Sequence, residues 1–120
     1  MTQAFQGLNV WQRVMKLTAS IYALTRTFPK DEEYRLTSQL RRASVFVASN
    51  IAEGRGRMTD GEFRQFPGIA QGSTYEVQTQ LLVAGQLKSG DLEMLRKAEP
   101  LCIETSQRLG AFIEPLGARG

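Results

Sequence analysis

The stretch LTSQLRRASVFVASNIAEG, residues 36–54, is typical of an amphipathic α-helix, because its apolar residues return every three or four positions. Five positions follow this spacing: Leu36, Leu40, Ala43, Val47 and Asn50. In an α-helix of 3.6 residues per turn, such positions share one face. Acidic residues at 31–33 stand where the helix dipole favours negative charge, and Gly54 suits the end of a helix. We therefore predict a helix over residues 31–53.

The same rhythm occurs in three further segments and predicts helices over residues 8–27, 60–88 and 91–115. The expected buried face of the segment 8–27 is Val10, Val14, Leu17, Ile21 and Leu24. That of the segment 60–88 is Phe66, Ala70, Ser73, Val77, Gln80, Ala84 and Leu87. That of the last segment is Leu95, Ala98, Cys102, Thr105, Leu109, Phe112 and Leu116. Pro67 and Pro100 fall inside two of these segments, where each either bends the helix or marks a helix start. Short connections favour antiparallel neighbours. The prediction is an all-α, up-down-up-down four-helix bundle, with residues 1–120 as one domain.

Composition limits the possible functions. The chain of 120 residues contains no histidine and a single cysteine, Cys102, so a histidine-based catalytic site or a structural zinc site cannot be built. We therefore expect a non-enzymatic protein without metal or cofactor. No apolar run approaches the roughly 20 residues that span a bilayer, and no signal peptide is evident at the start. These features, with the lone cysteine, predict a cytoplasmic protein without a membrane partner.

The apolar surface is wider than one bundle core requires. In the first segment, a second stripe follows Trp11, Met15 and Tyr22 beside the core face. In the second segment, Val45, Phe46 and Ala48 lie away from the core face or at its flank. Extended apolar surface is typical of subunit contacts, so these six residues form the predicted oligomer interface. The alternative is that the first helix lies deep and buries both of its stripes.

Polar residues also stand on the expected core faces. A buried polar group without a partner costs on the order of 1–3 kcal/mol, so such groups are expected to bond one another or an arginine. The predicted network is Arg41, Asn50, Glu53, Glu76 and Gln80. This network either fixes the register of the helices or forms a small polar site. An enzyme that uses Glu53, Glu76 and an arginine is the weakest of the functional hypotheses.

The excess of positive charge is mild, with a net charge of +3. Arg55 and Arg57 alternate with glycines after the second predicted helix, and Arg42 and Arg64 extend the same basic region. Guanidinium groups pair with phosphates through two hydrogen bonds, so these four arginines are the predicted nucleic-acid-binding residues. A solvated, solubilising surface explains the same residues equally well.

The sequence resembles a bacterial family of small four-helix proteins that are encoded within intervening sequences of large-subunit ribosomal RNA genes. The specific part of the resemblance is LTSQLRRA at 36–43, NIAEG at 50–54, and Gly56-Arg57. Weaker matches are Leu8-Asn9-Val10-Trp11, Phe28-Pro29, Phe63, Phe66, Ile69-Ala70, Gly72-Ser73, Glu76 and Gln80-Leu81. Two positions depart from the family pattern: Ala48 stands where proline is usual, and Pro67-Gly68 where Leu-Tyr is usual.

The resemblance implies a ring-like homopentamer, and the family is similar in fold to the accessory variability protein of diversity-generating retroelements. That relative works with a reverse transcriptase and nucleic acid. The leading hypothesis is therefore an oligomeric protein that contacts RNA or DNA, with itself and a nucleic-acid-processing protein as partners. The alternative is a structural or protein-interaction scaffold without a nucleic-acid ligand.

Overall fold

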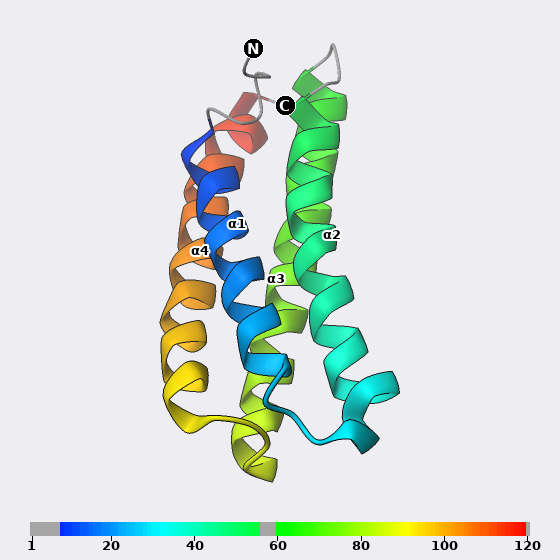
Figure 1. Ribbon diagram of the computed structural model, residues 1–120. Helices are drawn as coiled ribbons and strands as arrows, with labels where there is room; N and C mark the ends of the chain where they lie inside the picture. Colours follow the sequence, from blue (N-terminus) through cyan, green and yellow to red (C-terminus); the bar gives the residue numbers. More distant parts are fainter. Residues whose placement is uncertain (1–7, 56–59, 120) are drawn as a thin grey trace, which may run out of the picture.

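The computed structural model describes residues 8–55 and 60–119; the side chains of Glu33, Arg55, residues 60–65, Pro67 and residues 112–119 are outside the description. Within these ranges the chain forms four α-helices and no strand. The helices are α1 (Asn9–Thr25), α2 (Ser38–Arg55), α3 (Asp60–Leu87) and α4 (Leu92–Arg119), and the 3-10 turn η2 (Lys30–Glu32) and the π-helix η3 (Glu33–Thr37) precede α2. Figure 1 shows the four α-helices lying side by side. The predicted all-helical fold with four helices is confirmed.

Contacts between α1 and α4 follow opposite orders along these two helices. Asn9 contacts Arg108, and Arg13 contacts Glu104. Thr27, just after α1, contacts Asp91, just before α4. Residue numbers in α4 therefore decrease as those in α1 increase. The turns after α1 and after α3 therefore lie at the same end of the bundle (Figure 1). At this end a Cβ on Gly90, whose φ is +78°, would lie 2.6 Å from the ring of Phe28. This close approach explains the glycine.

The core sits along the inner faces of all four helices. Every residue predicted on the buried faces of the first two segments is buried, including Leu17 and Leu40, which are fully enclosed. Two clusters divide the core, one around Leu17 and Leu81 and another around Val14 and Ile51. The 3.6-residue period therefore identified the inner faces of these two helices correctly.

Leu87 is a predicted core residue that the structure places at the surface, whereas the side chains of Phe112 and Leu116, also predicted for the core, lie outside the description. The Leu87 side chain is 60% exposed, because Leu87 is the last residue of α3 and the chain turns away immediately after it. Lys88 takes a positive φ of 55° in this turn. The prediction that Leu87 belongs to the core is wrong. Several buried residues, in contrast, were left out of the prediction: Ser44, Ile51, Thr74 and Leu81.

The helix boundaries depend on local sequence. Neither proline starts a helix, because α3 runs from Asp60 through Pro67, and α4 runs from Leu92 through Pro100. The segment predicted to begin an α-helix at residue 31 instead opens with the 3-10 turn and the π-helix, and α2 begins at Ser38. Within the described residues, no helix combines the length and apolar character needed to cross a membrane.

Candidate functional site

An apolar groove of about 320 Å³ runs between α1 and α2 on the outside of the bundle. It is lined by Trp11, Met15, Thr18, Val45, Ala48, Ser49 and Ala52. Met15 and Val45 expose 44% and 42% of their surface, so apolar area faces solvent along the groove in the single chain. We call this surface the α1/α2 groove.

The groove forms because the two helices present different side-chain sizes. The bulky residues come from the second stripe of α1, whereas α2 contributes the small side chains of Ala48, Ser49 and Ala52. The Thr18 hydroxyl donates to the carbonyl of Val14 at 2.9 Å and lies 3.4 Å from the carbonyl of Ser44. This contact joins the two helices along the groove.

Four of the six residues predicted as an interface line this groove together: Trp11, Met15, Val45 and Ala48. Tyr22 and Phe46 lie elsewhere. Tyr22 packs against Arg41, and Phe46 lines a hollow of about 220 Å³ between α2 and α3. The predicted set therefore belongs to more than one surface of the chain.

A second apolar surface lies on α3. Ile69, Tyr75, Leu82 and Val83 are exposed there, and we call these four residues the α3 stripe. Gly68 and Gly72 leave open space beside it. Sequence reasoning missed this stripe, because its residues are separated by six, seven and one positions and do not repeat every three or four.

The predicted buried polar network is divided in the structure. The Asn50 amide donates to the carbonyl of Phe46 at 2.8 Å, and the Gln80 amide lies 3.4 Å from the Glu76 carboxylate, so each bonds within its own helix. The Oε1 atom of Gln80 is buried without a hydrogen-bond partner. Glu53 and Glu76 expose their side chains. The prediction that these two carboxylates are part of a buried network is wrong for the single chain, because both face outward.

Arg41 also lies outside the predicted network. Its Nε atom donates to the hydroxyl of Thr25 at 2.8 Å, and its guanidinium stacks over the ring of Tyr22. Both partners come from α1. Arg41 therefore links α2 to the last turns of α1 and does not bond Asn50 or Gln80 on the core faces.

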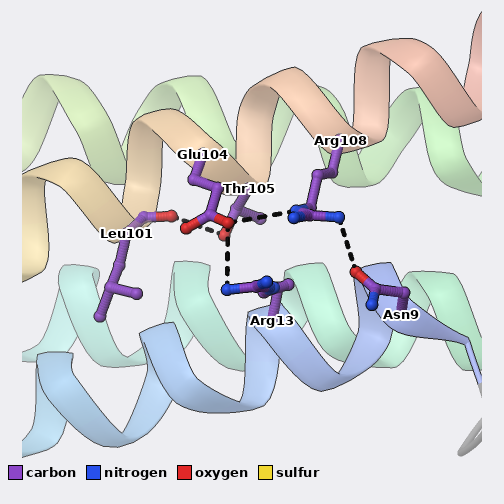
Figure 2. Close-up of polar contacts among 6 residues, drawn as sticks. All are labelled: Asn9, Arg13, Leu101, Glu104, Thr105 and Arg108. Atoms are coloured by element: carbon purple, nitrogen blue, oxygen red, sulfur yellow. Dashed lines mark hydrogen bonds and ion pairs between the residues drawn. The ribbon is translucent and has the colours of Figure 1, made fainter.

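Charged side chains join α1 to α4, as Figure 2 shows. The Glu104 carboxylate lies 3.0 Å from Arg13 and 3.2 Å from Arg108, and Arg108 donates to the Asn9 amide oxygen at 2.9 Å. These side chains are partly exposed, and such pairs stabilise a fold only slightly. The sequence offered one signal for this cluster, the spacing of Glu104 and Arg108 by four residues on one helix.

The predicted basic surface is described only in part. Arg42 is exposed on α2 and lines the hollow between α2 and α3 with Glu76. Arg57 lies outside the described residues, as do the side chains of Arg55 and Arg64. The relation of these four arginines to one another is therefore a prediction from the sequence.

The chemistry available to the described side chains is limited. Burial raises the pKa of the Cys102 thiol to about 12, and the thiol contacts the carbonyl of Thr74 at 3.6 Å. A thiol that stays protonated is a poor nucleophile. Among the described residues, no group of three histidine, cysteine or carboxylate side chains is arranged to hold a metal ion.

Comparison with known proteins relates most of the chain to one family. Residues 6–111 match the family described as 23S rRNA-intervening sequence protein. A crystal structure of a protein of unknown function from the S23 ribosomal protein family of Bacteroides thetaiotaomicron is similar in fold, with a TM-score of 0.79. The two chains are 17% identical, and the alignment covers 87% of this chain and 97% of the other. No curated protein matches the sequence. Neither description that matches names an enzymatic activity.

Proposed function

The chain belongs to the family of 23S rRNA-intervening sequence proteins, and we propose that it is a non-enzymatic, self-associating protein that contacts RNA. The proposed assembly is a ring-like homopentamer. The observation that carries the proposal is the pair of apolar surfaces on one chain, the α1/α2 groove and the α3 stripe. RNA contact rests on the basic residues and on the family's link to ribosomal RNA genes.

Two different apolar surfaces are what a head-to-tail assembly requires. In such an assembly each subunit offers one surface to the neighbour on one side and the other surface to the neighbour on the opposite side, and a ring closes the series. The groove presents Met15 and Val45, and the stripe presents Leu82 and Val83, all of them apolar and exposed in the single chain. We propose that the stripe of one copy occupies the groove of the next.

Each subunit of this assembly is proposed to be an antiparallel, up-down-up-down bundle. Support comes from the opposite order of the contacts between α1 and α4, where Asn9 meets Arg108 and Arg13 meets Glu104. The same opposite order relates α3 to α4, where Gln71 meets Ser106 and Thr74 meets Cys102. This topology leaves one side of each helix free for subunit contacts.

RNA contact is proposed to use Arg42, Arg55, Arg57 and Arg64. A ring repeats these arginines around its axis, and several weak sites on one rigid body raise the apparent affinity above that of a single subunit. The mild net charge of +3 for each chain is therefore compatible with useful affinity. Because phosphate contacts position a protein without reading bases, sequence specificity is expected to be low.

Mixing two interface variants tests the assembly. Val45→Glu places a charge in the groove, and Leu82→Glu places the same charge on the α3 stripe. Each variant alone is expected to remain monomeric in light scattering, because burying the carboxylate is costly. A mixture restores one intact groove and one intact stripe, so it is expected to form heterodimers and no ring. Gln107→Glu, which adds the same charge at an exposed site on α4, is the control.

The mixture separates head-to-tail contact from other arrangements. If the groove paired with the groove of another copy, Leu82→Glu would assemble normally and the mixture would yield no heterodimer. That result would contradict the proposed contact between groove and stripe. Loss of assembly in the Gln107→Glu control would show that added charge alone disrupts the oligomer.

Titration of labelled RNA and duplex DNA tests the basic surface. The double variant with Arg55→Ala and Arg57→Ala is expected to bind more weakly than the wild type and to show a shallower dependence on salt, because fewer counterions are released. A double variant with Arg26→Ala and Arg96→Ala removes the same charge from exposed sites in the described chain and serves as the control. If wild type binds no nucleic acid even at low salt, a scaffold without a nucleic-acid ligand is favoured.

A further inference from the structure

A cavity of about 370 Å³ opens at the end of the bundle where α1 finishes and α2 begins. It is lined by Thr25, Phe28, Pro29, Lys30, Thr37 and Arg41. The lining brings two cationic side chains and two hydroxyls together, and no described carboxylate lines it. Asp31 and Glu32 belong to the adjoining 3-10 turn but do not line the cavity.

Arg41 is held in one orientation at this cavity. Its Nε atom donates to Thr25 at 2.8 Å, and its guanidinium carbon lies 4.7 Å from the centroid of the Tyr22 ring. These two contacts use one N–H group and one face of the guanidinium. The two terminal Nη groups have no hydrogen-bond partner among the described residues. A fixed guanidinium with its two terminal nitrogens available matches the geometry of a phosphate, which accepts two parallel hydrogen bonds.

Thr37 places a second polar group in the lining of the cavity. Only 7% of this residue is exposed, and it lines the cavity from the last position of the π-helix. A hydroxyl in the cavity lining beside Arg41 can donate a hydrogen bond to a ligand. A π-helical turn inside a helical segment is frequent at functional sites.

We propose that this cavity binds the phosphate group of a phosphomonoester, with Arg41 donating through its Nη groups, Thr37 donating through its hydroxyl, and Lys30 adding charge at the exposed side. The site does not use Arg42, Arg55, Arg57 or Arg64 and is independent of the proposed basic surface. The same chemistry is offered by a free nucleoside monophosphate and by the 5′-phosphate at the end of an RNA strand.

The test is titration of the full chain with inorganic phosphate and with adenosine monophosphate. The NMR signal of the Arg41 Nε–H group and calorimetric heat report binding. Thr37→Val removes only the hydroxyl, and Arg41→Lys keeps the charge while it removes the planar fork. Each variant is expected to weaken binding about tenfold, the usual effect of losing a hydrogen bond to a charged group. Arg96→Lys, at an exposed site on α4, is the matched control and is expected to leave binding unchanged.

Two results would overturn the proposal. One is the absence of a saturable shift of the Arg41 signal at millimolar phosphate. The other is an equal effect of Arg41→Lys and Arg96→Lys, since that would reduce the interaction to nonspecific charge. Circular dichroism shows whether each variant is folded, so lost binding can be distinguished from lost folding. The Thr37→Val variant provides a second measurement of binding at the same cavity.

RNA oligonucleotides identify the source of the phosphate. A strand with a 5′-phosphate is compared with the same strand ending in a 5′-hydroxyl. Preference for the phosphorylated strand over adenosine monophosphate assigns the cavity to RNA ends, and the reverse preference assigns it to free nucleotides. The double variant with Arg55→Ala and Arg57→Ala keeps this cavity intact. It is therefore expected to bind phosphate as the wild type does, so this measurement tests the cavity separately from the basic surface.

Discussion

The guanidinium of Arg41 lies over the aromatic ring of Tyr22, with its central carbon 4.7 Å from the ring centroid. The two residues come from different helices, and the same arginine also bonds Thr25 one turn further along α1. This arrangement ties the beginning of α2 to the end of α1. It also fixes the orientation of the arginine at the cavity where phosphate binding is proposed.

A double-mutant cycle measures the Arg41–Tyr22 contact. Tyr22→Leu and Arg41→Met are made singly and together, and the free energy of unfolding is obtained from urea titrations. A coupling energy of about 0.5–1 kcal/mol is expected, because the ring is partly exposed and attracts the cation moderately. Strictly additive effects of the two substitutions would contradict the stacked geometry.

Two leucines of the same size test the placement of the core. Leu17 is fully buried and Leu87 is 60% exposed at the end of α3. Leu17→Ala is expected to lower the free energy of unfolding by about 2–5 kcal/mol, because it leaves a cavity. Leu87→Ala is expected to change it by less than about 0.5 kcal/mol. Equal losses in chemical denaturation would show that Leu87 packs in the core after all.

The Cys102 thiol gives a pH-dependent prediction. Burial raises its pKa from 9.0 to about 12, so as the pH rises above 9 the thiol of the unfolded chain loses its proton first. Cys102 therefore leaves the free energy of unfolding unchanged below pH 9 and lowers it by up to about 1.4 kcal/mol per pH unit between 9 and 12. Denaturation curves of wild type and Cys102→Ala are expected to diverge in this window. A constant difference between them at all pH values would contradict the raised pKa.

Pro100 tests the continuity of α4. The helix runs from Leu92 through Pro100 although proline lacks the backbone N–H group that an interior position would donate. Because Pro100 is exposed, Pro100→Ala removes little packing. The substitution is expected to raise the free energy of unfolding by at least about 1 kcal/mol, since proline costs up to about 3 kcal/mol in a helix interior. A loss of stability would indicate that the proline ends one helix and starts another.

The inner faces of the helices could be predicted because burial repeats with the period of the helix itself. Val14 and Val47 were placed correctly from spacing alone. The Arg41–Tyr22 pair could not be predicted this way, because it depends on how one helix is rotated against another. The π-helix before α2 also left no periodic signal. Asn50 shows the same limit, since its burial followed from spacing but its bond to Phe46 did not.

The mass of the wild-type protein in solution distinguishes the proposed ring from a single chain. Light scattering coupled to size-exclusion chromatography is measured over a range of micromolar concentrations. We expect a stable species with five times the 13.4 kDa mass of the chain, because neighbouring copies in the proposed ring cover the α1/α2 groove and the α3 stripe. A mass of one chain at every concentration would contradict the proposed ring.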